Sequence, residues 1–277
     1  MMTNMEYSVS QLEQTARQIR AKLVEMSHYG KASHLGSALS SVDILVSLYW
    51  KKLGLDQNTI KASDRNRFIL SKGHAASALY AALAFKNIIP KDLLETYCQQ
   101  GSKLEEHPGP GNLPGVEAAT GSLGHGLSIG LGMSLAGKIK KQAYHVFVLL
   151  SDGECNEGSV WEAAMFAPAK GLNRVCVIID FNKWQATDRS CEVMALQPLK
   201  EKWRAFGWNA MEIDGHDMDE LSRALSSIPD NPEKPTAIIA NTIKGKGISF
   251  MEDDNNWHYR IPNEQEMFRA KEELGIL

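Results

Sequence analysis

Short apolar runs alternate with longer amphipathic segments along most of the chain. The runs are rich in β-branched and aromatic residues, which is typical of strands that are buried on both faces of a parallel sheet. The predicted strands span residues 68–71, 145–150, 175–179, 210–213 and 236–242. Apolar positions three and four residues apart predict helices over residues 8–30, 41–52, 75–86, from Pro90, 121–141, 158–170, 202–206, 217–227 and 263–274. This alternation favours one α/β domain over residues 1–277: a doubly wound, mostly parallel sheet with helices on both faces.

Polar residues follow two of the apolar runs directly. Asp152 comes after run 145–150, and Asn182 comes after run 175–179, with the helix 158–170 between them. Both ends of such a strand–helix–strand unit lie at the same edge of a parallel sheet, so these two side chains are expected to be neighbours. Their carboxylate and amide oxygens are suited to bind Mg²⁺ together with phosphate oxygens, and the N-termini of nearby helices favour anions. A second interpretation stays open, in which Asp152 caps one turn and Asn182 starts another.

Five stretches resemble, in order, the diphosphate-binding half of transketolase, an enzyme that uses thiamine diphosphate. An Asp-Gly at a strand end, followed about thirty residues later by Asn, is similar to the thiamine diphosphate motif. The matching stretches cover nearly the whole chain and are SHLGSALSSVDIL (33–45), SKGHAASALYAAL (71–83), EEHPGPGNLPGVEAATGSLGHGLSIGLGMSLA (105–136), SDGECNEGSVWEAA (151–164) and NTIKGKGISFMED (241–253).

The resemblance implies roles for individual residues. It implies that Mg²⁺, which Ca²⁺ or Mn²⁺ can replace, binds Asp152, Asn182 and the backbone carbonyl of Trp184. It implies that thiamine diphosphate contacts His74, Gly121, Ser122, Leu123, Gly153, Glu157, Asn182, Ile243 and His258. The catalytic residues that it implies are His34, His107 and His258. Glu157 also matches a family glutamate at the subunit interface. Three residues depart from the family pattern, and they leave the substrate preference open: Ser151, His125 and Trp184.

The segment 121–141 has a helical pattern but contains six glycines. Each glycine inside a helix costs about 1 kcal/mol relative to alanine, so a reason for them is expected. Close approach of another backbone, a ligand or a partner chain would supply one. We expect a cofactor contact at residues 121–123 and, along the rest, packing against another subunit.

No stretch of the chain resembles the second, pyrimidine-binding domain of transketolases. The chain therefore resembles the N-terminal subunit of a split transketolase, which transfers a two-carbon ketol unit from a ketose or ketose phosphate donor to an aldose acceptor. The implied partner is a separate C-terminal subunit, in an α2β2 heterotetramer with cofactors at the interfaces. Two alternatives are an E1 alpha-like subunit of a 2-oxoacid dehydrogenase and a non-catalytic scaffold. The stretch LPGVEAATGSLGHG argues against the first, and the retained site residues argue against the second.

Composition restricts the class of protein further. The 277 residues carry a net charge of −3, which gives no electrostatic reason to expect binding to nucleic acid or to an anionic membrane. The N-terminus lacks the pattern of a signal peptide, and no apolar run approaches the ~20 residues of a membrane-spanning helix. The four cysteines show no C-x-x-C pairing, as expected for reduced thiols in a cytoplasmic protein.

Overall fold

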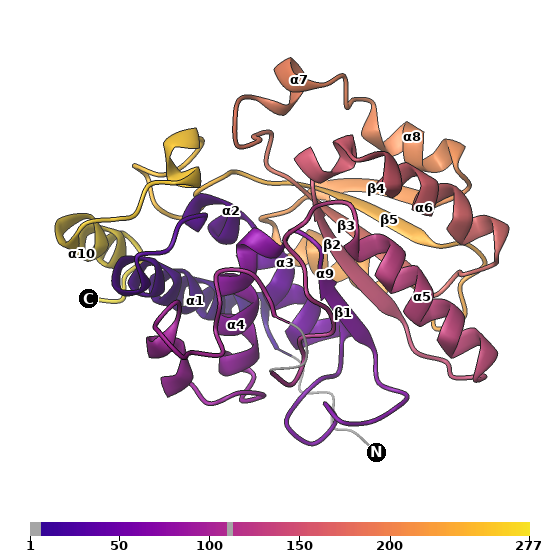
Figure 1. Cartoon of the computed structure of the whole chain (residues 1–277), viewed down its shortest axis with the longest axis horizontal. Coiled ribbons are helices and arrows are strands. Elements are labelled where there is room, and N and C mark those ends of the chain that lie inside the picture. Colours follow the sequence, from indigo (N-terminus) through magenta and orange to yellow (C-terminus); the bar gives the residue numbers. More distant parts are fainter. Residues whose placement is uncertain (1–6, 110–112) are drawn as a thin grey trace.

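The computed structural model describes residues 7–109 and 113–277, and its centre is a parallel sheet (Figure 1). The strands are β1 (Arg67–Leu70), β2 (Val146–Ser151), β3 (Val175–Phe181), β4 (Asn209–Asp214) and β5 (Thr236–Asn241). Within the described residues they form one sheet in the order β1-β2-β3-β5-β4, and every neighbouring pair is parallel. The predicted α/β class and the positions of the strands are therefore confirmed.

Helices cover both faces of this sheet, as the sequence predicted (Figure 1). Alternate residues of β2 point to opposite faces, with Phe147 in one apolar core and Val148 in the other. The first core includes side chains of α1 (Val9–Gly30), α3 (Val42–Ser47), α4 (Ala76–Phe85) and α9 (Met218–Ser226). The second core includes side chains of α5 (Gly126–Ile139), α6 (Gly158–Ala169) and α8 (Leu199–Ala205). Across the described ranges, no helix combines the length and apolarity needed to cross a bilayer.

The helical faces predicted from apolar spacing are the faces that are buried. Helix α1 begins after Ser8, which forms a capping box with Gln11. The apolar residues of α1 that are spaced three or four positions apart, Leu12, Ala16, Ile19, Leu23 and Met26, are all buried. The same holds for Val160, Ala163, Ala164 and Ala167 of α6. Burial of a helix face thus follows directly from the spacing of three and four residues.

Several predicted boundaries were wrong. Helix α3 begins after Ser41, as expected, but the Ser41 hydroxyl forms no capping bond and donates to buried Asp180 instead. A separate short helix, α2 (Leu35–Ser40), precedes it. The helix expected from Pro90 is a 3₁₀ segment, Asp92–Thr96, and a short helix that was not predicted, α7 (Ser190–Val193), follows β3. A π-helical turn, Leu48–Lys52, follows α3. The remaining helical segments are α10 (Glu264–Glu273) and the 3₁₀ segments Gly73–Ala75, Gly153–Asn156 and Asn255–His258.

The glycine-rich helix is also shorter than predicted, because α5 begins only at Gly126. Most of its glycines allow close packing on the chain's own sheet. A Cβ at Gly126 would lie 2.3 Å from the Ser71 hydroxyl, and one at Gly130 would lie 2.8 Å from the Val148 side chain. A Cβ at Gly137 would similarly meet Tyr144 at 2.8 Å. The expectation that subunit packing explains these three glycines was therefore wrong. Gly132 has open space beside it.

Candidate functional site

The ends of β2 and β3 lie side by side, as the strand–helix–strand pattern predicted. Ser151 is in register with Asp180, and the backbone N–H of Asp152 donates to the Asp180 carbonyl at 3.3 Å. The backbone N–H of Lys183 donates to Asp152 Oδ2 at 2.9 Å, which holds the turn after β3 against the end of β2. Asp152 and Asn182 are both buried, at 0% and 3% exposure. The two predicted metal-binding side chains thus belong to one small polar region.

The Asp152 carboxylate is surrounded by neutral hydrogen-bond donors. Besides Lys183 N–H, it accepts from the backbone N–H of Gly153 at 3.0 Å and from the hydroxyl of Ser190 at 2.7 Å. Burial is the main reason that its pKa is raised to about 6. A buried carboxylate without a positive partner is a good ligand for a cation.

The turn-forming roles considered for Asp152 and Asn182 are present as well. Asp152 accepts the N–H of Gly153, and Asn182 Oδ1 accepts the N–H of Trp184 at 3.1 Å. These bonds leave further lone pairs on the same oxygens, so the turns and a metal site are compatible. In the described part of the chain, no three His, Cys, Asp or Glu side chains are grouped to hold a metal. A metal here would need the amide oxygen of Asn182, a backbone carbonyl and oxygens brought by a ligand.

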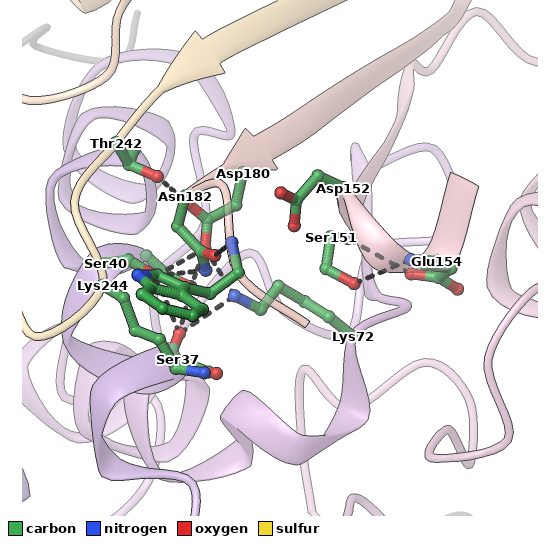
Figure 2. Close-up of polar contacts among 12 residues, drawn as sticks. Ser37, Ser40, Lys72, Ser151, Asp152, Glu154, Asp180, Asn182, Thr242 and Lys244 are labelled. Carbon is green, nitrogen blue, oxygen red and sulfur yellow. Dashed lines mark hydrogen bonds and ion pairs between the residues drawn. The ribbon is translucent and has the colours of Figure 1, made fainter. Parts of the chain in front are cut away.

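A second buried carboxylate, that of Asp180, lies next to Asp152 and was missed by the sequence analysis. Figure 2 shows Lys72 directed at Asp180, with which it forms an ion pair, and both side chains are fully buried. Asp180 also accepts hydrogen bonds from the hydroxyls of Ser40 at 2.6 Å, Ser41 at 3.1 Å and Thr242. Burial acts to raise the pKa of Asp180, but Lys72 and these hydroxyls together hold it below its usual value. An aspartate inside the apolar run VCVIID was the available signal.

A third buried acid, Glu154, fixes the loop before α5. Its carboxylate accepts from the Ser71 hydroxyl and from the backbone N–H of Gly124 at 2.9 Å. Gly124 has φ +86°, a conformation that a residue with a side chain rarely adopts. Glu154 therefore holds the turn 121–124 against the ends of β1 and β2. This turn carries the predicted cofactor contacts 121–123.

The four predicted histidines come together although they lie on four separate segments. The His34 ring centroid lies 5.5 Å from that of His74, 5.6 Å from that of His107 and 5.0 Å from that of His258. His34 precedes α2, His74 lies in the turn after β1, His107 lies in the long loop before α5, and His258 ends the segment Asn255–His258. Together they line one side of a cavity of about 420 Å³.

Most other predicted site residues line the same cavity. They are Gly121, Leu123, Gly153, Glu157, Asn182 and Trp184. Three predicted residues do not line it. Asp152 lies beneath the wall at 0% exposure, Ser122 is exposed, and the backbone N–H of Ile243 donates to His216 Nε2 at 2.8 Å. Two further wall residues, Asn156 and Gln185, each have a buried polar atom that no described residue hydrogen-bonds.

Lys244 is fully buried next to His258, which lines the cavity, and the sequence analysis assigned it no role. Its ammonium lies 2.9 Å from His258 Nδ1 and 2.7 Å from Asn255 Oδ1. Burial first, and the nearby Lys72 second, lower its pKa to about 7. Burial and Lys244 in turn lower the pKa of His258 to about 3, and burial with Lys72 lowers the pKa of His74 well below its usual value. An anion would stabilise the charged form of all three groups. Among the described residues, the carboxylates that act on Lys244 are those of Asp152, Asp180 and Asp254, and none of them forms an ion pair with it.

Comparison with known proteins agrees with this geometry. Residues 11–277 match the family model "Transketolase, thiamine diphosphate binding domain". The chain is 39% identical over 267 residues to a subunit of apulose-4-phosphate transketolase from Phocaeicola vulgatus, covering 96% of this chain and 95% of that one. It is 38% identical over 259 residues to 6-deoxy-6-sulfo-D-fructose transketolase subunit SqwG from Clostridium sp. (strain MSTE9), covering 94% of each.

Two solved structures that resemble this chain are those of longer proteins. Transketolase from Campylobacter jejuni matches with a TM-score of 0.87 and 27% identity, over 98% of this chain. Transketolase from Leishmania mexicana matches with a TM-score of 0.86 and 26% identity, over 95% of this chain. The chain spans only 43% and 41% of the length of these two proteins. It therefore matches the subunits from end to end and the solved enzymes over less than half their length.

Proposed function

Because this chain belongs to the family of the transketolase thiamine diphosphate-binding domain, we propose that it is the N-terminal subunit of a two-chain transketolase. The enzyme would transfer a two-carbon ketol unit from a ketose or ketose phosphate to an aldose acceptor. The end-to-end match to proteins named as transketolase subunits supports this proposal. The alternative of an E1 alpha-like subunit has no comparable match among the relatives described above.

The observation that carries the proposal is a buried carboxylate and a buried ammonium at one site, neither of which forms an ion pair with a described residue. Asp152 has a pKa raised to about 6 by burial and forms no ion pair with a described residue. Lys244 has a pKa lowered to about 7 mainly by burial and likewise forms no ion pair in the described part of the chain, and its partner His258 lines the cavity. A metal ion joined to a diphosphate supplies both charges at once. The donor set of the site therefore fits a metal–diphosphate group.

The residues proposed to hold this group follow from that fit. Asp152, Asn182 and the Trp184 carbonyl would hold Mg²⁺, or Ca²⁺ or Mn²⁺ in its place. The diphosphate would be bound by Gly153 N–H, His74, His258 and Lys244, while Gly121, Ser122, Leu123 and Ile243 would lie near the thiazolium ring. Bound thiamine diphosphate supplies the carbanion chemistry of ketol transfer.

The other cavity residues would act on the sugar. His34 and His107 line the cavity, where they would hold sugar hydroxyls and move their protons. Glu157, at the exposed rim, would contribute to the subunit interface. The relatives are named for apulose 4-phosphate and 6-deoxy-6-sulfo-D-fructose, so a sugar outside the common ketose phosphates is a reasonable first substrate to test.

We propose that the remaining half of the active site lies on a separate C-terminal subunit. That subunit would carry the pyrimidine-binding domain, and two copies of each chain would form an α2β2 heterotetramer. Two of the relatives are named as subunits of apulose-4-phosphate transketolase, which supports a two-chain enzyme. The exposed side chains of α5 and α6, including Ile129 and Phe166, offer apolar surface for such an assembly.

The test is to purify this chain alone and together with the product of the neighbouring transketolase-like reading frame. Each sample receives Mg²⁺, thiamine diphosphate and a panel of ketose donors, and ketol transfer is assayed. We expect turnover only when both chains are present. Robust transfer by this chain alone would refute the two-subunit proposal, and no transfer by the pair with any donor would refute the assignment as a transketolase.

A further inference from the structure

Glu106 lies beside His34, although 72 positions separate them in the sequence. The hydroxyl of Ser33 donates to Glu106 Oε1 at 2.6 Å, and the backbone N–H of Ser33 donates to the same oxygen at 3.0 Å. His34 Nδ1 lies 3.2 Å from that oxygen and 3.0 Å from the Ser33 hydroxyl. The carboxylate of Glu106 thus binds the residue before the histidine and faces one nitrogen of its ring.

These contacts determine where the proton of a neutral His34 resides. The Ser33 hydroxyl directs its hydrogen at Glu106, so only its oxygen lone pairs face His34 Nδ1. A lone pair on Nδ1 would then face two acceptors, whereas an N–H at Nδ1 satisfies both. The neutral ring therefore carries its proton on Nδ1, and Nε2 keeps a free lone pair.

The position of the His34 backbone is fixed separately from its ring. Its N–H donates to the His258 carbonyl at 2.7 Å, and its φ is +66°. Among the described residues, hydrogen bonds to the ring are made only at Nδ1. Because His34 lines the cavity, Nε2 is the nitrogen left for a substrate.

We propose that Glu106 is a positioning residue that makes His34 a neutral base for ketol transfer. This inference rests on the proposed function and specifies how one side chain of the same site works. When a sugar hydroxyl gives its proton to Nε2, the O–H bond breaks and an N–H bond forms. The ring becomes positively charged, and the Nδ1–H bond to Glu106 stabilises that charge. The same proton returns to an oxygen of the acceptor-derived product.

The surroundings of His34 make a carboxylate necessary for this step. The groups facing its ring are His74, His107, His258 and Tyr259, and Lys244 acts on it electrostatically. Burial is the largest influence on the pKa of His34 and lowers it, Glu106 raises it, and the net pKa is below the usual value. Glu106 is thus the group that opposes burial and makes proton uptake by His34 less unfavourable.

The activity test uses the two-chain enzyme with Glu106→Gln and, as a matched control, Glu105→Gln at the neighbouring exposed glutamate. At metal sites, loss of the group that orients a ligating histidine costs about 10- to 100-fold, and we expect a kcat reduction of a similar order for Glu106→Gln only. The affinity for thiamine diphosphate should stay within about twofold. The acidic limb of the kcat/KM profile should move to lower pH, because removing a negative charge lowers the pKa of His34. Glu106→Asp should restore part of kcat.

A second measurement does not depend on activity. ¹⁵N NMR of the histidine rings, with His34 assigned from a His34→Ala variant, should show the Nδ1–H form in the unmodified chain and a mixture in Glu106→Gln. An Nε2–H form in the unmodified chain would overturn the proposal. So would an unchanged pH profile and kcat in Glu106→Gln, or a parallel loss of cofactor affinity and stability. If the unmodified pair of chains transfers no ketol unit, the proposed function fails, while the NMR result still decides the tautomer.

Discussion

Two fully buried aspartates at the ends of adjacent strands, Asp180 and Asp152, differ in their ion-pair and hydrogen-bond partners. Asp180 at the end of β3 has Lys72 and three hydroxyl donors, which outweigh burial and lower its pKa. Asp152, directly after β2, has only neutral donors, and burial raises its pKa to about 6. Two lysines differ in the same way, since Lys72 is paired with Asp180, whereas Lys244 faces His258 and Asn255. Pairing within the chain thus distinguishes structural charges from charges available to a ligand.

The largest effect on stability is expected from breaking the buried ion pair between Asp180 and Lys72. Asp180→Ala leaves the Lys72 ammonium buried without its anionic partner, with the Ser37 carbonyl still accepting from it, and breaking a buried ion pair in this way costs about 3–5 kcal/mol. The free energy of unfolding, measured in urea without metal, should fall by that amount. Asp188→Ala, at an exposed neighbour, is the control. A loss below about 1 kcal/mol for Asp180→Ala would show that the Lys72 pair is not a structural element.

A smaller effect on stability is expected from changing Asp152, the acid without an ion-pair partner. The effect of this change on the binding of Mg²⁺ and thiamine diphosphate should be larger than its effect on stability. Asp152→Asn removes a buried charge that has no positive partner, so stability without metal should change by only about 1 kcal/mol, the value of an ordinary hydrogen bond. The stabilisation by Mg²⁺ and thiamine diphosphate, about 2.7 kcal/mol at 100 times Kd, should disappear. Thermal unfolding and calorimetry of the two-chain enzyme measure both. Unchanged Mg²⁺-dependent affinity would rule out Asp152 as the metal ligand.

The smallest effect is expected in the protonation of Lys244, where binding of an anion should lead to the uptake of at most one proton. Its folded-state pKa of about 7 is below that of a free lysine, so between about pH 7 and 10 the unfolded chain binds more protons and stability rises with pH. An anion should reverse this shift, and binding of inorganic diphosphate at pH 8 should take up protons. Calorimetry in buffers of different ionisation enthalpy detects the uptake, which Lys244→Met should remove. Equal uptake by that variant would assign the proton to another group.

The sequence predicted the parts of the site that depend on local order. Strand ends and helix faces follow from apolar spacing, which is why Asp152 and Asn182 were expected together. The Asp180–Lys72 pair joins residues 108 positions apart, and no local pattern distinguishes a paired acid from an unpaired one. The contact of Glu106 with His34 was missed for the same reason. The glycines of α5 were expected to permit close approach, but the sequence could not show that Val148 and Tyr144 were the approaching groups.

The hydrogen bonds of Asp180 have a consequence for the cooperativity of folding. Its partners come from three segments. They are Ser40 and Ser41 at the junction of α2 and α3, Lys72 two residues after β1, and Thr242 directly after β5. If any one of these segments is undocked, a carboxylate in the interior lacks part of its hydrogen bonding, which is unfavourable in a low-dielectric environment. States in which only some of these segments are folded against Asp180 are therefore higher in free energy than both the folded state and the state in which all of them are unfolded. We expect segments that are remote in sequence to unfold here as one unit.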